Sequence, residues 1–207
     1  MEKKLVITIG RQYGSGGREI GEKIASRYGL GYYDKQLLAI AAKESGLCDE
    51  IVEHYDEKKI SAAFMYPFSA NVYSYGIGGH MGTEKPLAMQ VFFAISNVIK
   101  KIATKESCVI VGRCADYILR DNPNLFSVFI CADDQDRVAR IMRRNNIDSE
   151  KVAYARMVKT DKNRARFYNY YSDHKWGAAE TYDLSVKSSY LGIDKTVETI
   201  CGVIDRL

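Results

Sequence analysis

The order of apolar and polar positions along the chain predicts short strands alternating with longer helices. Apolar runs predict strands over residues 5–9, 30–34, 108–112, 125–132 and 182–186. Segments with apolar residues at every third or fourth position predict helices over residues 18–28, 35–43, 86–105, 151–171 and 194–206. Further helices are expected near residues 49–59, shortly before Arg120 and from Asp133 onward.

Strands that are apolar along their length and separated by helices are typical of a parallel sheet covered on both faces. We therefore expect an α/β fold, in a single domain spanning residues 1–207. Such sheets bind their ligands at the carboxyl ends of the strands. Residues 10–18, Asp34, residues 112–113 and Asp133 follow predicted strands, so we expect them to gather at one edge.

Composition narrows the classes of function. The 30 basic and 26 acidic residues give a net charge of +4, which is too small to indicate a nucleic-acid-binding protein. The five cysteines are odd in number and lack CxxC spacing, as is typical of a reducing compartment. We see neither a signal peptide nor a membrane-spanning run, and we expect a cytoplasmic protein with no membrane partner.

The first strand leads into a glycine-rich turn, residues 10–17, and then into a helix that starts at Arg18. This is the arrangement of a phosphate-binding loop, where converging N–H groups and a helix N-terminus attract an anion. The alternative is a plain glycine turn, and "GSGGRE" does not complete the dinucleotide-binding pattern GxGxxG. The residues expected to bind a nucleotide's phosphates are Gly10, Arg11, Gly14, Ser15, Gly16, Gly17, Arg18 and Glu19.

This loop lacks the lysine of the usual motif GxxxxGK[ST]. Gly17 stands at the lysine position and Glu19 at the position of the hydroxyl residue. Arg11 or Arg18 could supply the missing cation, and Ser15 could supply a hydroxyl for Mg²⁺.

Three segments, "VITIGRQYGSGGREIG", "YYDKQLL" and "VIVGRCADYIL", together resemble the cytidylate kinase-like family, within the P-loop nucleoside monophosphate kinases. The resemblance implies a three-layer α/β/α P-loop fold with a five-stranded parallel sheet. It also implies a helical acceptor-binding insertion at about residues 49–84 and lid helices at about residues 137–172. The implied cofactors are ATP and Mg²⁺, and the implied acceptor is CMP or dCMP.

The aromatic segment 61–82 lies within the implied insertion and is expected to form a long loop. Its side chains Tyr73, Tyr75 and His80 could stack on a base or on another small molecule, or simply pack on the protein.

The resemblance also implies acceptor-binding residues. Arg113 matches the arginine of the family's Gly-Arg-Asp, whereas Cys114 replaces its aspartate and Asp116 lies nearby. Asp161 and Arg164 match an Asp-x-x-Arg that holds CMP, although they could instead form a solvated i,i+3 pair.

Asp34 matches the aspartate that ends the second strand of these kinases. It could orient the acceptor phosphate or hold the Mg²⁺ shell with Ser15, and it could also cap the next helix. That helix offers only Lys35 where the family has an arginine, which leaves the acceptor open.

The chemistry expected of the site is positioning and charge neutralisation. The catalytic residues expected are Arg18, Asp34, Arg140 and Arg144, with the two later arginines on the lid. We therefore predict a kinase of a small molecule, monomeric or homodimeric, without a nucleic-acid partner. The alternatives are a nucleotide-binding sensor with little or no turnover, and a kinase of a non-nucleotide molecule.

Overall fold

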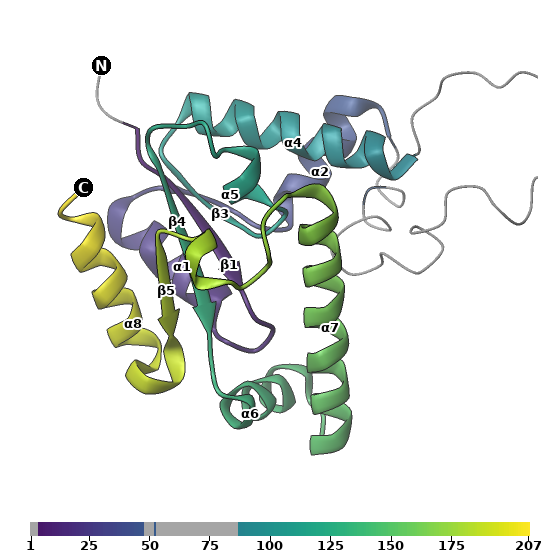
Figure 1. The fold of residues 1–207 in the computed structure, drawn as a ribbon, viewed down its shortest axis with the longest axis vertical. Helices are drawn as coiled ribbons and strands as arrows, with labels where there is room; N and C mark the ends of the chain where they lie inside the picture. Colours follow the sequence, from purple (N-terminus) through teal and green to yellow (C-terminus); the bar gives the residue numbers. More distant parts are fainter. Residues whose placement is uncertain (1–3, 48–51, 53–86) are drawn as a thin grey trace, which may run out of the picture.

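The structure is a computed structural model that describes residues 4–47, 52 and 87–207. Its five strands form one sheet in which every neighbouring pair is parallel, in the order β2-β3-β1-β4-β5 (Figure 1). The strands are β1 Val6–Arg11, β2 Gly31–Tyr33, β3 Cys108–Val111, β4 Leu125–Cys131 and β5 Leu184–Lys187. The predicted five-stranded parallel sheet is confirmed.

Helices cover both faces of this sheet, as the apolar strands require. The described helices are α1 Gly17–Tyr28, α2 Gln36–Ser45, α4 Leu87–Lys105, α5 Ala115–Ile118, α6 Asp134–Asn145, α7 Glu150–Tyr171 and α8 Ser188–Ile204, with a 3₁₀ turn η2 Ala179–Thr181.

Successive residues of β1 point to opposite faces of the sheet. Ile7 and Ile9 pack with residues of α1 and α8, such as Ile24 and Ile200, whereas Val6 packs with residues of α2 and α4. Each face therefore has its own apolar core, and the three-layer α/β/α fold is confirmed.

Helices α6 and α7 extend beyond the sheet (Figure 1). They pack on each other through a small core of Val138, Ile141, Ala153 and Met157. The other end of α7 joins the core of α2 and α4 through Phe167 and Tyr168. One long helix thus connects the outer helix α6 to the body of the protein.

The last helix, α8, has a short first segment that begins at Ser188, and a kink at the non-helical residue Gly192 separates it from the main segment. The main segment agrees with the helix predicted over residues 194–206. Ser188 is buried and its hydroxyl donates to the Ser15 carbonyl at 2.7 Å, a tertiary contact that sequence periodicity cannot reveal.

The predicted helix at 49–59 and the predicted loop at 61–82, with Tyr73, Tyr75 and His80, fall almost entirely outside the described residues. In the described part of the chain, no helix has both the length and the apolar character that a membrane crossing requires.

Candidate functional site

The turn between β1 and α1 has the backbone shape of an anion-binding loop. Gly14 and Gly16 adopt left-handed conformations, with φ of 83° and 86°. Gly16 is the N-cap of α1 and makes no side-chain cap hydrogen bond. Gly16 therefore offers no capping side chain to the first N–H groups of α1, at the end where the helix dipole is positive.

These groups open onto a cleft of about 660 Å³ at the carboxyl edge of the sheet. Loop residues form one wall, and α6 and α7 form the other. Nine described side chains lining it are basic: Arg11, Arg18, Lys35, Arg113, Arg140, Arg144, Arg156, Lys159 and Arg164. Asp34 is the acidic side chain among the described lining residues, so the cleft has the charge expected for a polyanionic ligand.

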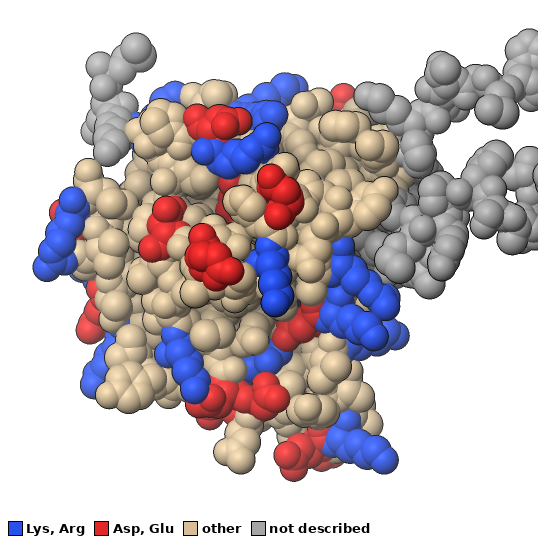
Figure 2. Space-filling view, in the orientation of Figure 1, with Lys and Arg blue, Asp and Glu red and all other residues tan. Residues whose placement is uncertain are grey.

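The cleft differs in charge from the face of the molecule that Figure 2 shows. On the face seen in Figure 2, Lys and Arg are interspersed with Asp and Glu. A lining with nine basic side chains and one acidic side chain therefore concentrates positive charge at the carboxyl edge.

Asp34 lies between two arginines on the floor of the cleft. Its Oδ1 accepts a hydrogen bond from Arg113 at 2.8 Å, and its Oδ2 lies 3.1 Å from Arg18 Nε. Asp34 and Arg113 are buried, whereas the Arg18 side chain is 41% exposed. The carboxylate thus fixes both guanidinium groups instead of capping α2, whose N-cap is Lys35.

The turn after β3, which places Arg113 beside Asp34, has a strained backbone. Arg113 and Cys114 both have left-handed backbones, with φ of 58° and 56°. Non-glycine residues seldom adopt this conformation, and such strain often accompanies functional sites.

Helices α6 and α7 hold the loop by its backbone. Asp161 Oδ1 accepts from the Tyr13 N–H at 2.7 Å, and Arg137 Nε donates to the Tyr13 carbonyl at 2.9 Å. Arg164 donates to the Arg11 carbonyl at 3.0 Å, and Arg140 donates to the Gly14 carbonyl.

Sequence reasoning placed Arg137, Arg156 and Lys159 in a basic cluster but did not select them for the site, and it named Lys35 only where the family has an arginine. The signal for Arg137 was available, because residues 137, 140 and 144 follow one face of a helix.

Most predicted site residues meet at this cleft, and some do not. Gly14, Gly16, Gly17, Arg11, Arg18, Asp34, Arg113, Arg140, Arg144 and Arg164 line it. Gly10 and Asp116 border a small cavity that adjoins the cleft and shares three lining residues with it, and Asp161 borders a shallow hollow outside the cleft. Glu19 lies on α1 beside Lys23, 3.8 Å away. Ser15 is fully buried, with no hydrogen-bond partner for its hydroxyl among the described residues.

Two of these carboxyl groups lie in environments that disfavour their charge. Burial raises the pKa of Asp116, although Tyr168 donates a hydrogen bond to it at 2.5 Å. Burial also raises the pKa of Asp161 and outweighs the opposing effects of the Tyr13 N–H and Arg137. In the structure Asp116 connects α5 to α7 through its hydrogen bond with Tyr168. Its role in acceptor binding stays a prediction.

We expect stability to depend on pH through Asp116. A raised folded-state pKa means that the folded protein binds the proton more tightly, so the contribution of Asp116 to the free energy of unfolding falls as pH rises. The fall begins near the unfolded value of about 3.9 and ends above the folded-state pKa. Urea unfolding of wild type and Asp116→Asn at a series of pH values should give curves that diverge across this window. Parallel curves would contradict the prediction.

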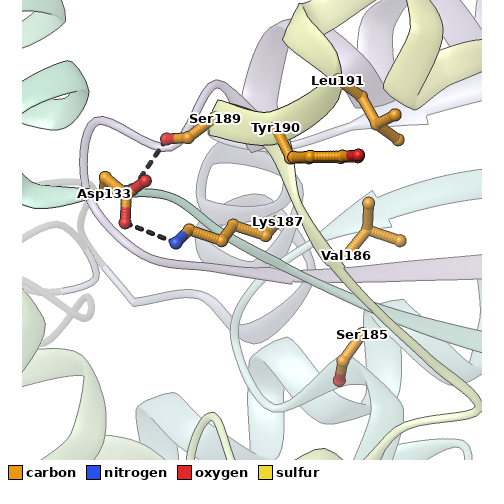
Figure 3. Close-up of a pocket in the computed structure, with 7 residues that line it drawn as sticks. All are labelled: Asp133, Ser185, Val186, Lys187, Ser189, Tyr190 and Leu191. Atoms are coloured by element: carbon orange, nitrogen blue, oxygen red, sulfur yellow. Dashed lines mark hydrogen bonds and ion pairs between the residues drawn. The ribbon is translucent and has the colours of Figure 1, made fainter.

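A second hollow lies beside β5 and the start of α8. Lys187, Ser189 and Tyr190 line it with Asp133 (Figure 3). Asp133 pairs with Lys187 at 2.5 Å, and its N–H donates to the Ser189 hydroxyl at 2.8 Å. Asp133 therefore follows β4 as expected, but it faces this hollow and not the basic cleft.

Comparison with known proteins agrees with this geometry. Residues 6–190 match the model of the cytidylate kinase-like family. The chain belongs to the cytidylate kinase-like family. Membership makes it a kinase-like phosphotransferase of the P-loop superfamily and leaves its acceptor open. A search of curated proteins gave no match.

Solved structures give the same fold. An uncharacterised protein from Eubacterium ventriosum ATCC 27560 is 32% identical, with 98% of this chain and 99% of that chain covered and a TM-score of 0.72. Shikimate kinase from Bacteroides thetaiotaomicron is 11% identical, with 97% and 98% covered and a TM-score of 0.54. Shikimate kinase from Acinetobacter baumannii, in complex with shikimate, is 11% identical, with 98% and 94% covered and a TM-score of 0.52. The latter two likenesses concern the fold alone.

Proposed function

We propose that this family member transfers the γ-phosphoryl group of ATP to a small anionic acceptor, with CMP or dCMP as the first candidates. The observation that supports this most directly is the cleft, which nine of the described basic side chains line together with Gly16 and Gly17 at the N-terminus of α1. Phosphoryl transfer needs such a clamp of cations and N–H groups around the phosphates.

The residues divide into two groups in this proposal. The loop and the first turn of α1 bind the donor phosphates, and Arg140 and Arg144 approach them from α6, which serves with α7 as a lid. Asp34 holds Arg18 and Arg113 at the floor, where their charges stabilise the transferring group. A phosphate acceptor is already anionic, so the protein needs no general base.

The residues of the cleft fit the phosphates of ATP better than they fit a Mg²⁺ ion. The glycines at 14 and 16 and the basic lining suit a nucleotide's phosphates. The residues suit Mg²⁺ less well, because both Asp34 oxygens face guanidinium groups and Ser15 does not line the cleft. The described residues also contain no cluster of three or more side chains that could bind a metal ion. Mg²⁺ would therefore be held mainly by the phosphates themselves. The metal-binding roles of Ser15 and Asp34 stay predictions.

A second candidate is nucleotide binding with little or no turnover. The specific observation in its favour is the loop itself, which has Gly17 in place of lysine and leaves the nearby Arg18 paired with Asp34. Kinases of non-nucleotide acceptors share the fold, including the shikimate kinases, so the acceptor could also be a small acid.

The test is Mg²⁺-dependent ADP formation from ATP with CMP, dCMP, UMP, AMP, GMP, shikimate, gluconate or no acceptor. We expect turnover with CMP or dCMP. Arg18→Ala should lower kcat by about 100-fold, the usual effect of removing one group that stabilises transition-state charge. Arg27→Ala, at the far end of α1, is the matched control and should match wild type.

The outcomes separate the candidates. Turnover with shikimate or gluconate alone would identify a kinase of a small acid. ATP binding by calorimetry without ADP formation across the panel would favour the sensor, and the absence of ATP binding would overturn both proposals.

A further inference from the structure

One residue of the loop, Tyr13, is held on both sides of its backbone. Its N–H donates to Asp161 of α7 at 2.7 Å, and its carbonyl accepts from Arg137 of α6 at 2.9 Å. Arg137 and Asp161 also form an ion pair with each other. Tyr13 is therefore the residue that both helices bond, between Arg11, which Arg164 bonds from α7, and Gly14, which Arg140 bonds from α6.

The Arg137–Asp161 pair is largely withdrawn from solvent, and Asp161 Oδ1 also lies 4.0 Å from Arg164 of α7. The Arg137 side chain is 5% exposed and the Asp161 side chain is 16% exposed. Arg137 has a second carboxylate partner, Asp134, at 3.1 Å, and that side chain is 58% exposed. Arg137 and Asp161 do not line the basic cleft, so neither is placed for a ligand there.

The contacts fix the part of the loop that precedes Gly14. With its N–H and carbonyl both bonded, Tyr13 cannot rotate either adjoining peptide plane without breaking a partly buried hydrogen bond. Gly14, the next residue, adopts its left-handed conformation against the Arg137 backbone. A loop held in its binding shape binds more tightly, because less ordering is required when the ligand arrives.

We propose that Asp161 and Arg137 are positioning residues that hold the phosphate-binding loop in shape, and that Asp161 does not contact the acceptor. This assigns to the pair a role in ATP binding, and in that respect it rests on the proposed function. It also links the loop to the two outer helices, since loss of either side chain frees one side of the Tyr13 backbone.

The first experiment measures amide hydrogen exchange by NMR in the protein without ligand, and so does not depend on ATP. Asp161→Ala should speed exchange at Tyr13 at least about tenfold. Gln12, whose N–H donates to the Ile130 carbonyl at 3.0 Å, is the internal reference and should not change. Asp134→Ala removes the exposed partner of Arg137 and should leave Tyr13 as protected as in wild type. Unchanged exchange at Tyr13 in Asp161→Ala would overturn the proposal.

The second experiment measures binding of ATP and of CMP separately by calorimetry. Asp161→Ala should weaken ATP binding about tenfold and leave CMP binding unchanged, whereas Asp134→Ala should alter neither. Weaker CMP binding with unchanged ATP binding would identify Asp161 as an acceptor contact and overturn the proposal.

Two safeguards keep the results decisive. If Asp161→Ala does not fold, Asp161→Asn serves in its place. The asparagine oxygen still accepts from the Tyr13 N–H, but the ion pair with Arg137 is lost. We then expect Tyr13 exchange to be intermediate between wild type and an unprotected amide, and exchange as slow as in wild type would contradict the role of the pair. If wild type binds no ATP, the proposed function fails, but the exchange experiment still decides whether Asp161 positions the loop.

Discussion

Replacement of Asp34 by alanine is expected to lower the free energy of unfolding by about 3 kcal/mol or more, the usual cost of removing one partner from a buried ion pair. Arg113 is 3% exposed and would keep its charge in the cleft floor without the carboxylate 2.8 Å away. Arg18 would lose its neighbour at 3.1 Å as well. Urea unfolding at neutral pH measures the change.

A surface pair in the same protein is the matched control. Asp133 pairs with Lys187 at 2.5 Å, but both side chains are more than half exposed. Asp133→Ala should therefore cost less than about 1 kcal/mol. Equal effects of Asp34→Ala and Asp133→Ala would mean that Arg113 finds another partner and that Asp34 does not organise the cleft floor.

Replacement of Gly14 by alanine is expected to weaken ATP binding at least tenfold, or about 1.4 kcal/mol. Gly14 has φ of 83°, and a Cβ there would lie 2.7 Å from the Arg137 carbonyl oxygen. That oxygen belongs to the backbone of α6 and cannot move aside as a flexible side chain can. The loop must therefore shift, and the N–H groups that follow it lose their alignment. Calorimetry with ATP measures the loss.

Gly29→Ala separates backbone strain from damage to the loop. Gly29 ends α1 with φ of 64°, and a Cβ there would meet no atom within 4 Å. This variant should lose about 1–2 kcal/mol of stability, the cost of a left-handed alanine, and bind ATP as wild type does. Equal ATP affinities in the Gly14 and Gly29 variants would contradict the proposed use of the loop.

Local pattern was enough to predict the sheet and the loop. The strands were recognisable because a central parallel strand is buried on both faces and therefore apolar throughout, as Val109 and Ile110 are. The loop was recognisable because left-handed backbone at Gly14 and Gly16 requires glycine. The short segment of α8 before the Gly192 kink was not predicted, and its contact from Ser188 to the Ser15 carbonyl joins residues 173 positions apart.

The sequence by itself determined the fold class, the family and the edge of the sheet where a ligand would bind, because these depend on periodicity, glycine and a few contiguous motifs. Only the tertiary structure decided what each charged side chain faces. Asp34 lies between Arg18 and Arg113, and Asp161 bonds the Tyr13 N–H instead of lining the cleft. The physical reason is that charge interactions depend on distance and burial, and residues 148 positions apart acquire both only when α7 packs against the loop.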